Sequence, residues 1–311
     1  MPFKKKISLF LLVIKEVSSE FSADNILKYS ASLAYYTVFS IAPLLVVLTT
    51  LFGFIFGQEA MQGRVYEQLN KLVGSNAATE IQNLIKNIHL SNNSFFATVL
   101  SIIILLIGAT SIFGEIQDSI NKIWGLRIKK NKAWWKLILT RLLSFSLILS
   151  MGLIMIVSFL LNAIVAAFGK FIGKFIAQYS IYFIQIADAI LSLLVATFLF
   201  AFIFKVLPDA KIRWKDVLFG GFITAIFFTL GKLGINLYIQ KSNLNSLYGA
   251  AGSIIIFMVW VYYSSIILYL GAEFTKVFTK LYGEKISPNE YADWVKIEKK
   301  TVSSPELKTK I

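Results

Sequence analysis

The chain has 311 residues, 57% hydrophobic and 15% charged, whereas a soluble domain carries about 25% charged residues. These values indicate an integral membrane protein. The net charge of +14 suits either a nucleic-acid-binding surface or a membrane chain whose basic residues gather on one side. The absence of cysteine excludes disulfides and thiolate chemistry, and a single histidine, His89, argues against histidine-based metal sites and catalysis.

Residues 1–28 predict an amphipathic helix that lies in the membrane interface. Three lysines, Lys4 to Lys6, precede apolar residues that recur with helical spacing from Ile7 to Phe21. A cleaved signal peptide is disfavoured, because no A-x-A site follows and charged residues continue. Asp24 and Asn25 are cap-type residues that separate this helix from the next.

The first predicted span, about 33–57, is an uncharged stretch long enough to cross a bilayer. Ser32, Tyr36 and Ser40 are spaced four apart and share one helix face, and Pro43 predicts a kink. A polar stripe is costly against lipid, so we expect it to face other helices. It either lines a cavity or makes interhelical hydrogen bonds, which are common in membrane bundles.

Five further apolar runs predict spans at about 95–114, 142–168, 180–204, 217–239 and 249–272. The expected fold is therefore an all-α integral membrane protein with six transmembrane helices over residues 29–282. A polar, basic tail follows over 283–311, with one short helix around Glu290 to Lys300. Glycines in the last two spans, such as Gly220, Gly231 and Gly271, predict close helix packing.

The basic residues predict the orientation of the spans. Of the 31 lysines and arginines, 24 fall in the N-terminal segment, the second and fourth connections and the tail. The positive-inside rule then places both termini in the cytoplasm. This asymmetry also explains the net charge without a nucleic-acid partner. Trp124, beside a basic turn, is expected in the aromatic belt at the interface.

Two ionisable residues lie inside predicted spans, where burial costs at least about 2.5–3.5 kcal/mol. Asp188 and Lys232 have similar depths near the outer ends of spans four and five, so they are expected to be able to pair. Gln185 and Asn236 would share the polar patch. The patch either binds an anionic headgroup or relays a proton, or it is a structural ion pair; in a third alternative Lys232 extends to the interface.

Acidic residues mark the cytoplasmic side. Glu115 and Asp118 follow span two and Glu273 ends span six, so a cavity open to the cytoplasm would collect them. The sequence holds no HExxH, GxSxG or P-loop motif. Glu115 and Asp118 are the one candidate acid–base pair, and at a basic membrane surface such residues are usually solvated charges. We therefore expect no enzyme, no cofactor and no metal site.

Several blocks of the sequence resemble the YihY / virulence factor BrkB family over roughly residues 20–283. The blocks that carry the resemblance are SASLAYYTVFSIAPLL from Ser30, Asn121 with Trp124, Leu207-Pro208-Asp209, Leu247-Tyr248-Gly249-Ala250 and Gly271-Ala272-Glu273. The resemblance implies a bacterial plasma (inner) membrane protein with six spans and cytoplasmic termini. The family has no settled activity. Its members were once labelled ribonucleases, a label regarded as mistaken, and some are linked to lipid or lipopolysaccharide trafficking.

These observations favour a protein of the lipid bilayer that transports or translocates a lipid-like or anionic solute. The kinked polar first span and the buried Asp188 and Lys232 carry this hypothesis. The alternative is a non-transporting envelope scaffold that holds partners through its basic loops and tail. A membrane-bound ribonuclease is a weaker third hypothesis.

Overall fold

The computed structural model describes residues 3–40, 79, 111–129, 177–242 and 252–295. The long helices within these ranges are α1 (Phe3–Ala23), α7 (Ala177–Val206), α8 (Trp214–Lys241) and α10 (Gly252–Tyr282). Two further helical stretches cover residues 26–40 and 111–123. Pro43, His89, residues 95–110 of the predicted span at 95–114 and the whole predicted span at 142–168 lie outside the described residues.

Three of the described helices are long and apolar enough to cross a membrane, over Gln185–Val206, Trp214–Ile239 and Ile254–Tyr282. They confirm that the chain is a mostly helical membrane protein and correspond to the last three predicted spans. The count of six spans and the orientation stay predictions. The last helix continues ten residues past the predicted end at 272, because Phe274, Val277 and Phe278 keep a helical spacing and pack on neighbouring side chains.

Helix α8 packs between α7 and α10 through small residues. A Cβ atom on Gly220 would fall on the side chain of Thr275, and one on Gly271 would fall on Thr224. These two reciprocal contacts bring the backbones of α8 and α10 close together, as the sequence predicted. Gly234, in contrast, has open space around it.

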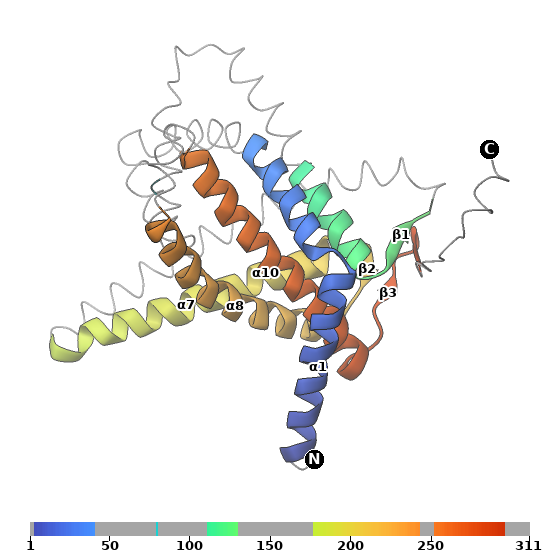
Figure 1. Cartoon of the computed structure of the whole chain (residues 1–311). Coiled ribbons are helices and arrows are strands. Elements are labelled where there is room, and N and C mark those ends of the chain that lie inside the picture. Colours follow the sequence, from blue (N-terminus) through green and yellow to red (C-terminus); the bar gives the residue numbers. More distant parts are fainter. Residues whose placement is uncertain (1–2, 41–78, 80–110, 130–176, 243–251, 296–311) are drawn as a thin grey trace, which may run out of the picture.

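The N-terminal helix packs on the end of α10 and then turns sharply. Val13 and Val17 of α1 are buried against Phe274 and Val277 of α10. The helix ends at a two-residue turn in which Asn25 has a φ of 55°, a left-handed conformation that asparagine tolerates. Helix 26–40 then runs beside α10 (Figure 1). The predicted separation at Asp24 and Asn25 is therefore observed.

Four short strands gather at one end of the helices, which we call the strand end (Figure 1). Strand β1 (Leu126–Ile128) pairs antiparallel with β4 (Ala292–Trp294), and β2 (Ala210–Lys211) pairs antiparallel with β3 (Ser287–Pro288). Residues 292–294 thus form a strand, and the prediction of a helix around 290–300 is wrong there. The reason is tertiary: the exposed edge of β1 offers backbone partners to a segment whose own composition is polar.

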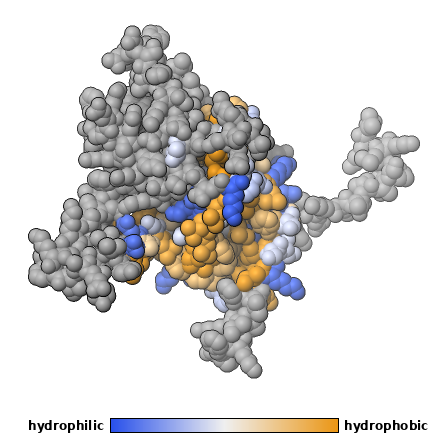
Figure 2. Space-filling model, turned by 60° about the vertical axis from the view of Figure 1, so that its left-hand side comes forward, coloured by the Kyte–Doolittle hydropathy of each residue, from blue (hydrophilic) through white to orange (hydrophobic). Residues whose placement is uncertain are grey.

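On the face shown in Figure 2, much of the described surface is apolar. One side of α7 exposes large hydrophobic side chains at successive helical turns, and α8 does the same. These residues are Ile186, Ile190, Leu194 and Phe198 on α7, and Leu230, Leu233 and Leu237 on α8. Exposed apolar stripes of this length suit contact with lipid chains.

Candidate functional site

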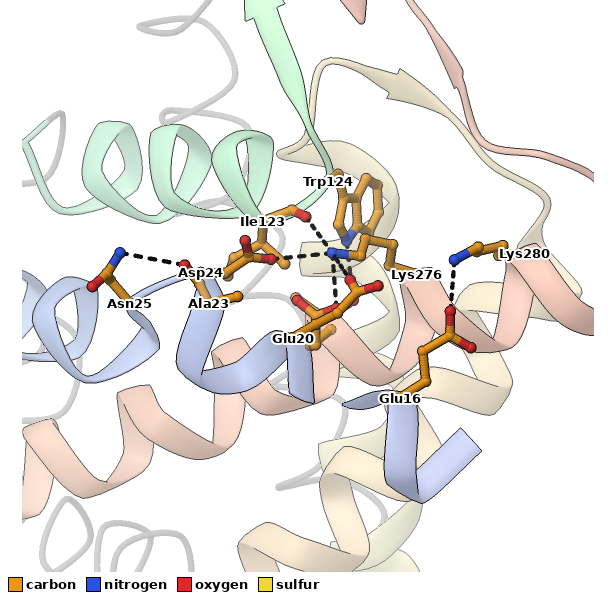
Figure 3. Close-up of polar contacts among 11 residues, drawn as sticks. Glu16, Glu20, Ala23, Asp24, Asn25, Ile123, Trp124, Lys276 and Lys280 are labelled. Carbon is orange, nitrogen blue, oxygen red and sulfur yellow. Dashed lines mark hydrogen bonds and ion pairs between the residues drawn. The ribbon is translucent and has the colours of Figure 1, made fainter. Parts of the chain in front are cut away.

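Lys276 of α10 joins three separate elements at the strand end (Figure 3). Its ammonium contacts the carboxylate of Glu20 on α1 and lies 3.1 Å from Asp24 Oδ2 in the following turn. It also lies 2.8 Å from Glu273 Oε1, one turn earlier on α10, and donates to the carbonyl of Ile123, 2.8 Å away. That carbonyl ends helix 111–123, where a cation is favourable. We call these five residues the Lys276 cluster.

The acidic residues of the cluster outnumber its cation. Oxygens of Glu20, Asp24 and Glu273 lie within 4.8 Å of one another, and the Glu273 side chain is completely buried. Carboxylate oxygens suit a hard metal ion, but here the ammonium of Lys276 already contacts all three, so we assign the set no metal. A second ion pair, Lys280 to Glu16 at 2.6 Å, lies nearer the solvent on the same two helices.

The electrostatic environment of Glu20 follows from these contacts. Burial alone raises the pKa of this carboxyl group, because it disfavours the charged form. Hydrogen bonds from Glu273 and Lys276, together with the positive charge of Lys276, outweigh burial and lower the pKa below its ordinary value. The surroundings of Glu20 therefore favour its ionised form.

Asp209, in the loop after α7, is the centre of a second buried cluster. Gln117 donates from Nε2 to Oδ1 at 2.9 Å, and Asn121 donates from Nδ2 to Oδ2 at 2.6 Å. The backbone N–H of Asp209 donates in turn to Asn121 Oδ1 at 2.9 Å. The carbonyl of Asp209 accepts from the N–H of Asn289, beside β3. The Asp209 cluster thus fixes helix 111–123 to the loop and to the strands.

Trp124 links the two clusters. Its side chain is 2% exposed and its indole Nε1 donates to the carbonyl of Ala272 on α10 at 3.0 Å. The expectation that Trp124 lies in an interfacial aromatic belt is therefore wrong. Gly125 follows with a φ of 69°, which ends helix 111–123 and lets its carbonyl accept from Val295.

The family resemblance is confirmed by comparison with known proteins. Residues 17–293 match the family described as virulence factor BrkB. The chain belongs to this family. Of the blocks that carried the resemblance, three meet at the two clusters: Asn121 with Trp124, the loop that ends in Asp209, and Gly271 to Glu273. Residues 247–250 lie outside the described part of the chain.

Related proteins are known by the name UPF0761 membrane protein. One from Psychromonas ingrahamii is 28% identical over 260 residues, which cover 81% of this chain and 82% of the relative. One from Pseudoalteromonas atlantica is 24% identical, and the match covers 85% of that relative. One from Ralstonia nicotianae is 23% identical over 80% of this chain but only 54% of its own length. The chain therefore spans about half of some relatives that it matches. No solved structure matches.

In this BrkB-family chain the predicted acidic group on the cytoplasmic side is divided. Asp118 is exposed, and Glu115 is half-buried and accepts a hydrogen bond from the Ser119 hydroxyl at 3.5 Å. Glu273 is buried in the Lys276 cluster. The structure thus groups Glu273 with Glu20 and Asp24, which the sequence analysis left in the N-terminal helix.

The predicted polar stripe of the first span is also divided. Ser40 is buried, Ser32 is half-buried, and Tyr36 is 39% exposed. Ser30, Thr37 and Ser40 each donate a hydrogen bond to the backbone carbonyl four residues earlier on this helix. The bond from Ser40 to Tyr36 is 2.9 Å long. The packed face instead follows Ile26, Ser30 and Leu33. Pro43 lies outside the described residues.

The predicted patch of spans four and five lies along the packed pair α7 and α8. Asp188, Lys232 and Asn236 are half-buried, and Gln185 is exposed. An ion pair between Asp188 and Lys232 stays a prediction.

Sequence reasoning missed most of the two clusters. Asp24 was predicted only as a cap-type residue and Asp209 only as part of a block that carries the family resemblance, and Glu20, Gln117 and Lys276 were not predicted as site residues. The available signal was spacing: Glu20 and Asp24, like Gln117 and Asn121, stand four apart and project from one helix face. Their partners come from distant segments, which no local pattern reveals.

Proposed function

We propose that this BrkB-family protein translocates an anionic or lipid-like solute across the bacterial inner membrane, with both termini in the cytoplasm. The observation that carries the proposal is the fully buried Glu273 in α10, held beside Lys276. A buried ionisable group is costly, and such groups cluster at functional sites. In addition, the Lys276 cluster connects α10 to α1, a separate helix that packs on it.

Two of the polar positions in the membrane helices are open, which supports the proposal. Tight packing around Tyr36 and Asp188 would have argued against translocation, because a translocator needs a polar path to the midplane. Instead Tyr36 is exposed and Asp188 is half-buried. We infer that these positions face the path of the solute, with Lys232 near its outer opening.

The test is lipid translocation in proteoliposomes. Wild-type protein is compared with Asp188→Asn and Lys232→Met, and Lys241→Met, at the exposed end of the same helix, is the matched control. We expect activity in wild type and control and a loss of at least about tenfold in both test variants, since each removes a membrane-embedded charge. Folded wild-type protein without activity on zwitterionic or anionic lipids would overturn lipid translocation.

The strand end favours one alternative, a scaffold. It is an ordered layer that exposes basic side chains and Trp294, which is 55% exposed. We infer that Trp294 would bind a partner protein there. Crosslinking in native membranes followed by mass spectrometry, with Trp294→Ala as the variant, tests this. Identical crosslinked proteins in the wild type and the variant would reject it.

We propose no catalytic activity, and purified protein should leave RNA uncleaved in the presence of Mg²⁺.

A further inference from the structure

The oxygens around Lys276 outnumber the hydrogens that it can donate. An ammonium group has three N–H donors, but four oxygens surround Nζ, from Glu20, Asp24, Glu273 and Ile123. Its hydrogen bonds of good geometry go to Asp24 Oδ2 and to the carbonyl of Ile123, and it forms ion pairs with Glu20 and with Glu273 Oε1. Neither carboxyl oxygen of Glu273 accepts a hydrogen bond of good geometry, although the whole side chain is buried.

An ionised Glu273 would therefore be poorly solvated. The donor beside it, Lys276, is shared with Glu20, Asp24 and Ile123, and a buried carboxylate that is poorly supplied with donors is disfavoured. The carboxylates of Glu20 and Asp24, whose oxygens lie within 4.8 Å, disfavour it further. A protonated Glu273 has no such problem. It can donate its O–H to a neighbouring carboxylate, and the carboxylate oxygens of Glu20 and Glu273 lie within 4.8 Å of each other.

We propose that Glu20 and Glu273 form a proton-binding site, in which one shared proton holds α1 against α10. With the proton bound, Glu20 and Asp24 carry the negative charges and Lys276 the positive one. The proton replaces a hydrogen-bond donor that the protein does not supply. This inference does not depend on whether the protein translocates a solute.

The other charged groups around the pair belong to three elements. On α10, Lys276 contacts both carboxyl groups, and Lys280 binds Glu16 of α1 further out. Asp24 lies in the turn. On helix 111–123, Glu115 lies near Tyr269, and Lys122 lies over the ring of Tyr29. Lys276 is the cation that faces the pair directly, and it stabilises the single negative charge left on Glu20.

A shared proton predicts that docking of α1 has an optimum pH. At acidic pH a second proton neutralises Glu20. Its pKa is lowered in the folded protein, so its contribution is present above the ordinary glutamate pKa and is lost as the pH falls through the lowered value. At alkaline pH the shared proton leaves, and two adjacent carboxylates repel each other. The two steps belong to the pair as a whole.

Hydrogen–deuterium exchange in lipid nanodiscs tests the site. Protection factors of α1 amides are measured from about pH 2, below the ordinary glutamate pKa, to about pH 10, and are corrected for intrinsic exchange. In the wild type, the protection of α1 amides should fall at both the acidic and the alkaline end of this range. Glu273→Gln, whose amide also donates to Glu20, should lose the alkaline fall and keep the acidic one. Glu16→Gln, which removes an ordinary ion pair between the same helices, should keep both.

Infrared spectroscopy provides a readout that does not require any variant to fold. Wild-type protein at neutral pH should show a protonated-carboxyl band that shifts in deuterated water and disappears at alkaline pH together with the protection of α1. In folded Glu273→Gln the band should be absent. A wild type without this band at neutral pH overturns the proposal. So does an alkaline fall in protection that persists unchanged in Glu273→Gln.

Discussion

The strand end and the outward sides of α7 and α8 differ in the contacts that their side chains make. At the strand end, buried carboxylates and amides of distant segments bind one another with specific partners. Along α7 and α8, large apolar side chains remain exposed; Leu194 is 50% and Leu233 61% exposed. Buried polar groups tolerate few alternative arrangements, because each lost partner is costly. Contact with lipid tolerates many. The relative positions of these helices are therefore specified mainly at the strand end.

Lys276→Met should produce the largest destabilisation. It leaves Glu20, Asp24 and Glu273 close together without their cation, and breaking a buried pair in this way costs about 3–5 kcal/mol. The measurement is the unfolding midpoint in detergent or mixed micelles. Lys280→Met is the control, because Lys280 is 59% exposed and such pairs are worth about 1 kcal/mol or less. Equal effects of the two variants would show that the Lys276 cluster does not specify the strand end.

Asp209→Ala should produce the second-largest destabilisation, a loss of about 2–3 kcal/mol in the free energy of unfolding. The substitution leaves the buried amides of Gln117 and Asn121 without their acceptor, and each unsatisfied buried group is costly. Limited proteolysis of the loop at 207–213, compared with unfolding midpoints, measures the loss. Asp293→Ala, which removes an exposed pair with Lys129, is the matched control and should change little.

Gly271→Val should cost about 1–3 kcal/mol, because its new side chain must displace Thr224 at the contact of α8 and α10. Gly234→Ala has open space and should be neutral or slightly stabilising, since alanine is the better helix former. Thermal unfolding of both variants checks the difference. A Gly271→Val variant as stable as wild type would mean that α8 and α10 do not pack as closely as described.

Leu233→Ala should have the smallest effect, within about 0.5 kcal/mol, as substitutions away from packed contacts usually do. The same unfolding measurement applies. A loss comparable to that of Asp209→Ala would overturn the contrast, because it would show that the exposed side of α8 packs against protein.

Patterns that need only one segment were predictable from the sequence. The apolar lengths of α7, α8 and α10 and the turn at Asp24 and Asn25 follow from local composition. Glycine packing at Gly220 and Gly271 also agrees with expectation. Long-range polar partnerships were not predictable. Asp209 lies 88 residues from Asn121, and the bond from Trp124 ends on a backbone carbonyl, which carries no sequence signal at all.

The site was predicted less well than the fold for the same reason. Glu273 was recognised as a candidate, but its neighbours were sought in Glu115 and Asp118 rather than in the N-terminal helix. Charged residues near the ends of helices are usually solvated, so Glu20 and Lys276 were not predicted to belong to a site. Strand β4 was missed because a three-residue strand depends on its partner, β1, and not on its own periodicity.

The two-residue turn at Asp24 and Asn25 gives α1 the geometry of a lever. Its 21 residues extend about 30 Å at 1.5 Å per residue, while Glu20 and Asp24, which hold Lys276, lie beside the pivot. A rotation of about 10° there would move the far end of α1 by about 5 Å over that length.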